Sequence, residues 1–216
     1  MKILINAGPT HESIDPVRFI GNHSSGKMGI AIAVAAEKCG ADVHLVAGPG
    51  VNVPAGLMLS ETRVTSAAEM AEACVKAFPS CDVAILAAAV ADFTPEVKHG
   101  SKLKRGDQDL IIRLKPTADI AGSLGSAKKA GQLLVGFALE TDNEVDNAIG
   151  KLKRKNLDMI VLNSLRDEGA GFGTDTNRIT IIDKYNNIDK FELKSKDEVA
   201  MDILGKIASL TQKKRE

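Results

Sequence analysis

The chain has 216 residues, of which 44% are hydrophobic, and its 28 Lys plus Arg balance its 28 Asp plus Glu, so the formal net charge at pH 7 is zero. A balanced charge gives no overall attraction to nucleic acid or to an anionic membrane, and it favours small molecules as partners. The three cysteines, Cys39, Cys74 and Cys81, form no CxxC pair, which argues against a zinc site or a disulfide framework. No apolar run is as long as a membrane span, and residues 1–5 lead directly into a strand instead of a signal sequence, so we expect a cytoplasmic protein.

The first part of the chain reads as strand, loop, helix and strand. Residues 2–7 are a short apolar run, as in a strand buried on both faces of a parallel sheet. A loop over residues 8–18 follows, and residues 30–38 contain no Gly or Pro and are rich in helix formers. Residues 41–47 form the next apolar run and end in Gly-Pro-Gly. This order predicts a βαβ unit.

The rest of the chain continues to alternate between apolar runs and helix-forming stretches, without an internal repeat or a linker. We expect helices over residues 67–78, 120–129, 145–155 and 196–210, and strands over residues 62–64, 81–91, 109–114, 132–138, 157–162, 179–183 and 190–194. Ser66 and Glu69 predict a capping box at the first of these helices. Asn186-Asn187 predicts a hairpin turn, and the glycine-rich residues 169–173 predict a flexible turn. The pattern predicts one domain over residues 1–216 with a Rossmann-like α/β fold: a doubly wound, mostly parallel sheet with a C-terminal β-hairpin and helix.

Residues 21–29, with the sequence GNHSSGKMG, place small residues, two hydroxyls and a lysine just before the first helix. Such a turn exposes unpaired backbone N–H groups beside the positive end of the helix dipole, which predicts a phosphate site. The alternative is that Ser24 or Ser25 caps the helix and the glycines only turn the chain. The glycine spacing does not match G-x-G-x-x-G, and the Gly-Lys pair is not followed by the Ser or Thr of a P-loop. We therefore expect neither a dinucleotide dehydrogenase nor an ordinary P-loop NTPase.

Two polar segments follow the apolar run at residues 81–91. Asp92 comes directly after this run, and open α/β sheets bind ligands at the carboxyl ends of their strands. Residues 98–106 carry five basic side chains in nine positions, which a solvated hairpin tip explains at least as well as a set of phosphate clamps. If the segment is a clamp, we expect Lys102 and its neighbours to reach over a bound nucleotide and to contact its phosphates.

A set of sequence blocks carries a resemblance to a known family. The blocks are GPT (8–10), IDPVR (14–18), NHSSGKMG (22–29), AAAVADF (87–93), KLKR (102–105), KPTADI (115–120), VGFALET (135–141) and KRKNLD (153–158). In this order they resemble phosphopantothenoylcysteine synthetase, a ligase of coenzyme A biosynthesis, and the resemblance covers residues 2 to about 185. The sequence leaves open whether the synthetase is free-standing or belongs to a protein fused to a phosphopantothenoylcysteine decarboxylase.

The resemblance implies a two-step ligation of 4′-phosphopantothenate with L-cysteine. In the bacterial enzymes the carboxylate of 4′-phosphopantothenate attacks the α-phosphate of CTP to give an acyl-cytidylate and pyrophosphate, and the cysteine amine then displaces CMP. The resemblance also implies Mg²⁺ on the triphosphate, with no metal ligand assigned to the protein, and a homodimer with sites completed across the interface. No residue reads the base, so the choice between CTP and ATP stays open.

The resemblance further implies roles for individual residues. Asn22 is expected to hydrogen-bond the acyl-cytidylate, Lys102 to stabilise charge at the transferred group, and Arg18 to orient the loop or the phosphorylated substrate. The expected nucleotide pocket comprises Gly8, Ser24, Ser25, Gly26, Ala88, Ala89, Asp92, Phe137, Lys151 and Lys155.

Each of these roles competes with a simpler structural one. The alternatives left open are an ion pair of Arg18 with Asp15 or Glu12, a turn cap for Asp92, a core position for Phe137, a solvated helix face for Lys151 and Lys155, and a structural instead of a general-base role for His23.

Two rival classes of protein also remain. A Rossmann oxidoreductase would need a glycine fingerprint and an acidic residue after the second strand, and a non-catalytic nucleotide-binding module would not need Asn22 or Lys102.

Overall fold

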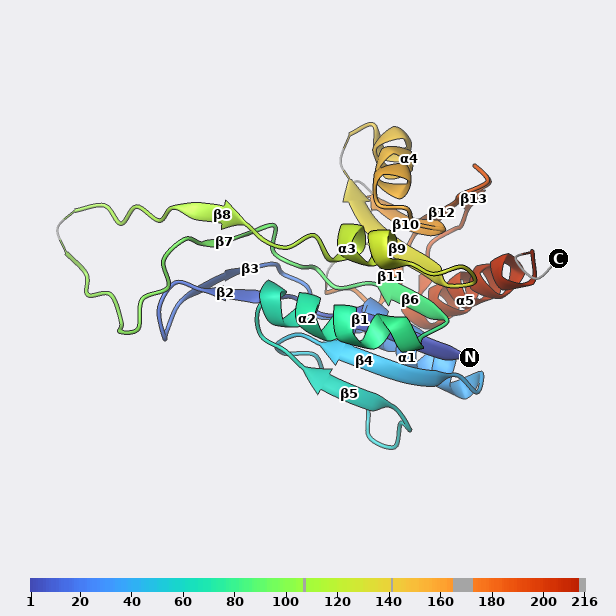
Figure 1. The fold of residues 1–216 in the computed structure, drawn as a ribbon, viewed down its shortest axis with the longest axis horizontal. Helices are drawn as coiled ribbons and strands as arrows, with labels where there is room; N and C mark the ends of the chain where they lie inside the picture. The colour runs from blue at the N-terminus through green and yellow to red at the C-terminus, as the bar shows by residue number, and fades with distance from the viewer. Residues whose placement is uncertain (107, 141, 165–172, 214–216) are drawn as a thin grey trace.

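The computed structural model describes residues 1–106, 108–140, 142–164 and 173–213, and a sheet of eight strands forms its centre (Figure 1). The strands lie in the order β13-β12-β10-β9-β6-β1-β4-β5. Neighbours from β10 to β5 pair in parallel, and β12 pairs antiparallel with β10 and β13. The bounds are β1 (Lys2–Ala7), β4 (Asp42–Ala47), β5 (Ser60–Arg63), β6 (Val83–Leu86), β9 (Leu133–Glu140), β10 (Met159–Ser164), β12 (Ile179–Asp183) and β13 (Ile188–Lys190).

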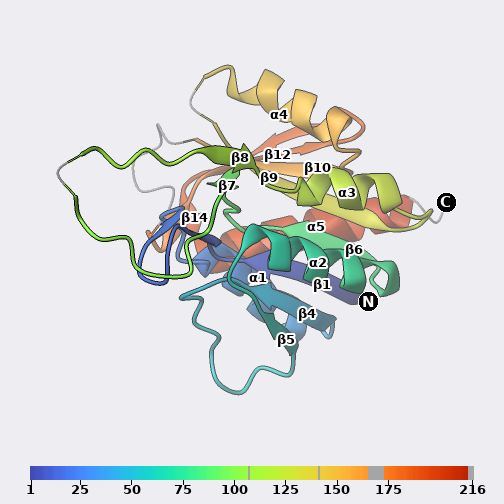
Figure 2. The ribbon, with the colours of Figure 1, turned by 60° about the vertical axis from the view of Figure 1, so that its left-hand side comes forward.

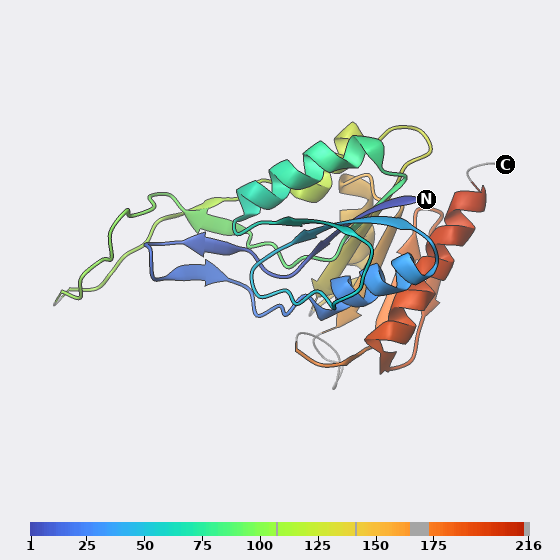
Figure 3. The same ribbon diagram turned by 90° about the horizontal axis from the view of Figure 1, so that it is seen from below.

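Helices cover both faces of this sheet (Figures 2 and 3). One face carries α1 (Lys27–Lys38) and α5 (Lys196–Lys213), and the other carries α2 (Ala67–Ala77), α3 (Ile120–Ala127) and α4 (Glu144–Arg154). Within β1, Ile3 and Ile5 pack in the core beside α1 and α5, whereas Leu4 packs in the core beside the other three helices. This alternation is what a strand buried on both faces requires. The predicted Rossmann-like, mostly parallel sheet with a C-terminal hairpin and helix is confirmed.

The helix ends follow local signals in the sequence. The predicted capping box begins α2: Ser66 Oγ accepts from the Glu69 N–H at 3.3 Å, and the Ser66 N–H donates to Glu69 Oε2 at 3.2 Å. Asp119 caps α3, since its Oδ1 accepts from the Gly122 N–H at 3.0 Å. A short 3-10 helix (Phe78–Ser80) follows α2. Within the described ranges, no helix has both the length and the apolar character needed to cross a lipid bilayer.

The long strand predicted over residues 81–91 is only partly correct, because β6 ends at Leu86. Beyond it, backbone N–H groups turn away from the sheet ladder to other partners. The Ala88 N–H donates to Asn6 Oδ1 at 2.9 Å, and the Ala89 N–H donates to the Gly8 carbonyl at 2.9 Å. These bonds across the sheet end convert an apolar run into a loop beside the end of β1.

Two other predicted strands are wrong in position. Residues 109–113 form no strand, and β8 (Leu114–Pro116) pairs instead with β7 (Phe93–Pro95). The alternating pattern there faced no core, since Ile111 is 84% exposed. The last hairpin strand is β13, and residues 194–195 form β14 (Lys194–Ser195), which pairs with β11 (Thr176–Asn177).

The predicted loop at residues 8–18 contains a strand that the sequence did not reveal. β2 (His11–Ser13) pairs antiparallel with β3 (Phe19–Gly21). This hairpin and the β7–β8 ribbon leave the carboxyl end of the sheet together and extend away from the body as an arm (Figure 1). The glycine-rich turn predicted at residues 169–173 lies, apart from Gly173, outside the described residues.

Candidate active site

The strand order changes direction between β1 and β6. The chain runs from β1 to β4 and β5 on one side, and it then crosses to β6, β9 and β10 on the other. Open α/β sheets bind ligands in the crevice outside the carboxyl ends of such strands. Here the crevice is bounded by Ala87, Ala88 and Ala89, which follow β6, and Gly8, which follows β1, accepts a hydrogen bond from the Ala89 N–H.

Gly8 and Gly26 bring two distant loops together beside this crevice. Gly8 has φ +87° and Gly26 has φ +74°, in the left-handed region that side chains rarely adopt. A Cβ atom on Gly8 would lie 2.2 Å from Val51 Cγ2, and one on Gly26 would lie 2.8 Å from the same atom. Both positions therefore require glycine, for conformation and for space.

The N-terminus of α1 opens onto the crevice without a side-chain cap. The N-cap residue is Gly26, the helix has no acidic residue in its first turn, and residues 24–29 line a cavity. The alternative that Ser24 or Ser25 caps the helix is wrong, because Ser24 Oγ only accepts from the Gly26 N–H, at 3.3 Å. Uncapped N–H groups at a helix N-terminus are suited to bind an anion.

Two cavities adjoin at the crevice and share the wall formed by Ala88, Ala89, Phe137 and Leu139. The smaller has a volume of about 140 Å³ and lies against the start of α1. The larger has a volume of about 550 Å³ and lies beside α3 and α4.

Most of the predicted nucleotide residues meet in these cavities. Ser24, Ser25 and Gly26 line the smaller cavity, and Asp92, Lys151 and Lys155 line the larger one together with Asn22. Ala88, Ala89 and Phe137 line both, and Gly8 supports the loop behind them. Phe137 is half-buried in the shared wall, so it is neither a fully buried core residue nor a surface residue.

Lys151 in α4 and Lys155 directly after α4 have defined partners instead of a purely solvated face. Lys151 Nζ donates to the Phe137 carbonyl at 2.8 Å, and burial together with the nearby Lys155 lowers the pKa of Lys151. Lys155 Nζ pairs with Asp119 Oδ1 at 2.9 Å. Asp119 also caps α3, so the pair ties two helices together at the wall of the larger cavity.

Asn22 holds the loop that follows β6. Its Nδ2 donates to the Ala89 carbonyl at 3.0 Å and to the Val90 carbonyl at 3.1 Å. Because both hydrogens of Nδ2 are used in this way, the group that Asn22 offers to a ligand is its Oδ1 acceptor.

Arg18 forms the ion pair with Asp15 that the sequence offered as an alternative. Asp15 Oδ2 accepts from Arg18 Nε at 3.0 Å and from Arg18 Nη2 at 2.5 Å. The same pair holds both backbone groups of Leu103: Arg18 Nη2 donates to its carbonyl at 3.0 Å, and its N–H donates to Asp15 Oδ2 at 3.1 Å. The Arg18 hydrogen bonds hold the pKa of Asp15 well below its usual range. Arg18 and Asp15 thus fix the backbone next to Lys102.

Lys102 itself lies on the arm, exposed, and it lines neither cavity. The described chain therefore does not bring Lys102 to the residues that surround the crevice. Arg18 likewise lines neither cavity, so two of the three residues predicted to be catalytic lie outside the cavities of this chain.

Sequence reasoning missed four polar residues at the crevice. Asn6 is buried, and its Oδ1 accepts a hydrogen bond from the Ala88 N–H. Asn163, Asn177 and Lys196 line the smaller cavity. The signal for Asn6 was a polar residue inside an apolar run. Asn163 had the same signal as Asp92, a polar residue directly after a predicted buried strand.

The donors around the crevice suit phosphate oxygens better than a protein-bound cation. They are backbone N–H groups, serine hydroxyls and lysines. In the described ranges, no three His, Cys, Asp or Glu side chains lie close enough together to hold a metal ion.

The fold and this crevice define a doubly wound α/β protein with a candidate ligand site at its topological switch point. Residues 1–210 match the family of the DNA/pantothenate metabolism flavoprotein C-terminal domain, and the chain belongs to this family.

Three relatives show how far the similarity extends. The chain is 65% identical over 209 residues to a protein named cysteine/cysteine sulfinic acid decarboxylase, from an unknown prokaryotic organism, covering 97% of this chain and 58% of that protein. It is 46% identical over 211 residues to the coenzyme A biosynthesis bifunctional protein CoaBC of Bacillus subtilis strain 168, covering 97% of this chain and 52% of that protein. A crystal structure of the C-terminal domain of a CoaBC protein matches with a TM-score of 0.83 and 41% identity, over 98% of this chain and 96% of that one. The chain thus spans little more than half the length of these two full-length relatives.

Proposed function

We propose that the chain is a phosphopantothenate–cysteine ligase of coenzyme A biosynthesis that activates its acid substrate with CTP. The observation that carries this proposal is the pairing of an uncapped helix N-terminus with a nucleoside-sized cavity at the switch point, in a chain of this family. Similarity along nearly the whole chain to a protein of coenzyme A biosynthesis supports it.

In the first step, a carboxylate oxygen of 4′-phosphopantothenate attacks the α-phosphorus of CTP. A new C–O–P linkage forms, the bond from the α-phosphorus to the bridging oxygen breaks, and pyrophosphate leaves. The uncapped N–H groups of α1 and the hydroxyls of Ser24 and Ser25 bind phosphate oxygens. Catalysis of this kind depends on positioning and on neutralising charge.

In the second step, the amine of L-cysteine attacks the acyl carbon of the acyl-cytidylate. The C–N bond forms, the C–O bond to the cytidylate breaks, CMP leaves with the bonding electrons, and the amine proton passes to solvent or to a phosphate. The Oδ1 of Asn22 faces this intermediate as an acceptor, because the Asn22 Nδ2 is already used to hold the loop at Ala89.

The nucleoside of CTP occupies the larger cavity. Its volume of about 550 Å³ is within the range of small-molecule sites. Asp92 binds the ribose, Phe137 packs against the nucleoside, and Lys151 and Lys155 add positive charge at the wall. Mg²⁺ is bound by the triphosphate and neutralises its charge when the nucleotide binds.

The arm supports a homodimer as the active form. Its exposed apolar side chains include Val17, Phe19, Phe93, Val97 and Ile111, each more than half exposed. Lys102 lines neither cavity of its own chain. In a homodimer, it contacts a phosphate that is bound in the partner's crevice. We assign residues 1–216 to one synthetase domain in the cytoplasm, acting beside a separate or fused phosphopantothenoylcysteine decarboxylase.

A second candidate function is the decarboxylation in the name of the 65% identical relative. That name describes a whole protein, and the matched part is 58% of it. Release of CO₂ from L-cysteine by this chain without nucleotide would favour decarboxylation over ligation.

The test is pyrophosphate release by the purified protein with 4′-phosphopantothenate and Mg²⁺, with CTP or ATP, and with or without L-cysteine. The proposal predicts release that depends on CTP and turns over steadily only when cysteine is present. A folded protein that binds CTP and releases no pyrophosphate would instead be a non-catalytic nucleotide-binding module.

A further inference from the structure

The smaller cavity has an apolar wall into which two amide side chains are set. Met28, Ala87, Phe137 and Leu139 supply apolar surface. Asn163, at the end of β10, and Asn177, in β11, line the same cavity. β10 pairs with β9 so that Asn163 lies opposite Leu139, which places its amide beside the crevice.

The carbonyl oxygens of these two amides are buried and have no hydrogen-bond partner among the described residues. Asn177 is only 1% exposed, and its Nδ2 donates to the Met28 sulfur at 3.8 Å. Buried polar atoms are nearly always hydrogen-bonded, because leaving one unpaired costs its lost hydration. Two such oxygens in one cavity indicate a ligand that brings hydrogen-bond donors.

Lysines stand at the edge of the same cavity. Lys196 is 8% exposed, and its Nζ donates to the Thr174 and Thr176 carbonyls at 2.5 and 3.0 Å. Lys27, the first residue of α1, pairs with Asp175 at 2.7 Å. The cavity therefore combines acceptors for N–H groups with a positive edge that attracts a carboxylate.

We propose that this cavity binds a small α-amino acid, with its ammonium or amine group on Asn163 Oδ1 and Asn177 Oδ1 and its carboxylate toward Lys196. Given the ligase function proposed above, on which this step rests, the amino acid is L-cysteine. Its thiol then lies against the apolar wall that includes Met28 and Phe137.

The end of this cavity that Asn163 and Asn177 line suits an amino acid better than the phosphates bound beside Ser24 and Ser25. A volume of about 140 Å³ suits a small amino acid, and the larger cavity of about 550 Å³ suits the nucleoside. Phosphate oxygens carry no donor for the two amide oxygens. The wall shared with the larger cavity, which includes Ala88 and Ala89, places a bound amine next to an acyl group held there. The positive charges of Lys27 and Lys196 favour the neutral amine that must attack.

The test compares Asn177→Leu, which removes the acceptor at similar size, with Asn177→Asp, which keeps an acceptor. The matched control is Asn52→Ala, at an exposed position outside both cavities. We expect Asn177→Leu to raise the KM for L-cysteine about tenfold or more and to leave the single-turnover release of pyrophosphate without cysteine within about twofold. Asn177→Asp and the control should keep the KM within about threefold.

An unchanged cysteine KM in Asn177→Leu would overturn the proposal, and so would a loss of the cysteine-independent release equal to the change in KM. If the wild-type chain releases no pyrophosphate at all, the ligase function fails, and the cavity is tested by melting temperature instead. L-cysteine should then raise the melting temperature of the wild type but not of Asn177→Leu, and 3-mercaptopropionate, which lacks the amine, should have no effect. Equal effects of the two compounds, or an effect that survives in Asn177→Leu, would show that the cavity holds only water or a non-specific ligand.

Discussion

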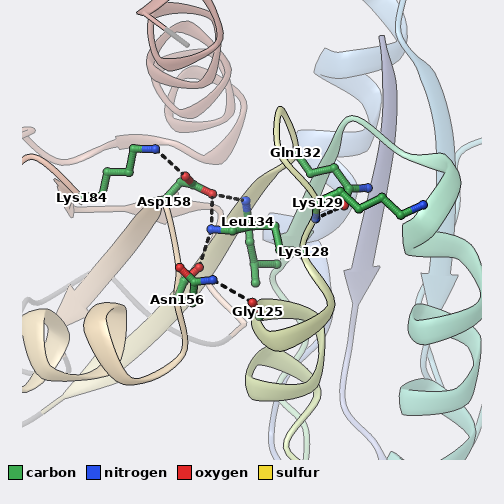
Figure 4. Close-up of polar contacts among 8 residues, drawn as sticks. All are labelled: Gly125, Lys128, Lys129, Gln132, Leu134, Asn156, Asp158 and Lys184. Carbon is green, nitrogen blue, oxygen red and sulfur yellow. Dashed lines mark hydrogen bonds and ion pairs between the residues drawn. The ribbon is translucent and has the colours of Figure 1, made fainter.

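The buried polar groups at the two ends of the sheet differ in whether they have hydrogen-bond partners among the described residues. At the amino end of β9 and β10, Asp158 is the centre of a satisfied network (Figure 4). Its carboxylate accepts from the Leu134 N–H at 2.9 Å, from Lys128 Nζ at 2.8 Å and from Lys184 Nζ at 3.0 Å. At the carboxyl end, the start of α1 is uncapped, and the buried oxygens of Asn163 and Asn177 have no partner among the described residues.

We interpret this difference as one between polar groups that stabilise the fold and polar groups that we propose to bind a ligand. In the network at the amino end, the neighbours of Asp158 are bonded as well: Lys128 Nζ also donates to the Asn156 carbonyl at 2.6 Å, and Asn156 Nδ2 donates to the Gly125 carbonyl at 2.8 Å. A network whose members are bonded in this way holds helix and strand ends in one arrangement. At the crevice, the start of α1 and the two amide oxygens have no side-chain partner among the described residues, as the proposed binding of substrates requires.

The largest effect is expected from Asp158→Asn. Removing the negative charge leaves Lys128, with a side chain only 10% exposed, without its ion pair. We expect the free energy of unfolding to fall by about 3–5 kcal/mol, with nucleotide binding retained in the folded fraction. Urea unfolding followed by circular dichroism measures the change.

The matched control for this variant is Asp42→Asn. Asp42 pairs with Lys2 at 3.9 Å, and both side chains are more than 60% exposed. This change should cost no more than about 1 kcal/mol. Similar losses for the two variants would mean that the Asp158 network is not the stabilising centre of the amino end.

The next effect in size is expected from Asn22→Asp in the crevice. The new carboxylate no longer donates to Ala89 and Val90, and it places a negative charge beside the acyl-cytidylate. We expect pyrophosphate release to continue and amide formation to slow about a hundredfold, since a positioned hydrogen-bonding group contributes on this scale. Quenched-flow measurement of both products separates the two steps, with Asn52→Asp as the control. An equal slowing of both steps would contradict the role given to Asn22.

A smaller effect is expected from Asp15→Asn, which weakens the contact of Arg18 with the arm. Because Asp15 and Arg18 hold the backbone of Leu103, the variant should misplace Lys102 and slow the first step about tenfold. Lys102→Gln should slow the same step, and the double variant should be no slower than Lys102→Gln alone. Asp109→Asn, at another exposed position on the arm, serves as the control. Additive effects would show that Asp15 acts independently of Lys102.

The smallest effect is expected from lowering the pH, which leaves the free energy of unfolding unchanged near pH 7 and reduces it only in acid. Burial raises the pKa of Asp158, but the hydrogen bonds from Lys128 and Leu134 outweigh it and hold the pKa below its usual range. A carboxyl with a lowered pKa in the folded state binds protons more readily when unfolded. Its contribution is therefore complete above the unfolded pKa of about 4 and is lost as the pH falls through the folded pKa. Urea unfolding between pH 7 and pH 3 should show a decline below about pH 4 that is shallower in Asp158→Asn. Parallel curves for the two proteins would exclude Asp158 as a source of the decline.

Local sequence patterns predicted the sheet and its helices well, because each strand and helix buries a face that its own periodicity records. The apolar run in β1, the capping box at Ser66 and the small residues before α1 are all signals carried within a few positions. The same patterns failed on the arm. The alternation at residues 109–113 faces no core, and β2 and β3 have only three residues each, too few for a periodic pattern.

The sequence by itself determined the Rossmann-like sheet, the turn of small residues at the start of α1 and the family resemblance, since these depend on short-range order along the chain. Only the tertiary structure decided that Arg18 and Asp15 hold the backbone of Leu103, that Lys102 lies outside its own chain's crevice, and that Asn163 and Asn177 share one cavity. These facts depend on contacts between residues far apart in the chain, and no local pattern records which distant groups will meet. Whether a buried oxygen such as that of Asn177 finds a partner is decided by packing, because its hydrogen bond must come from another part of the fold or from a ligand.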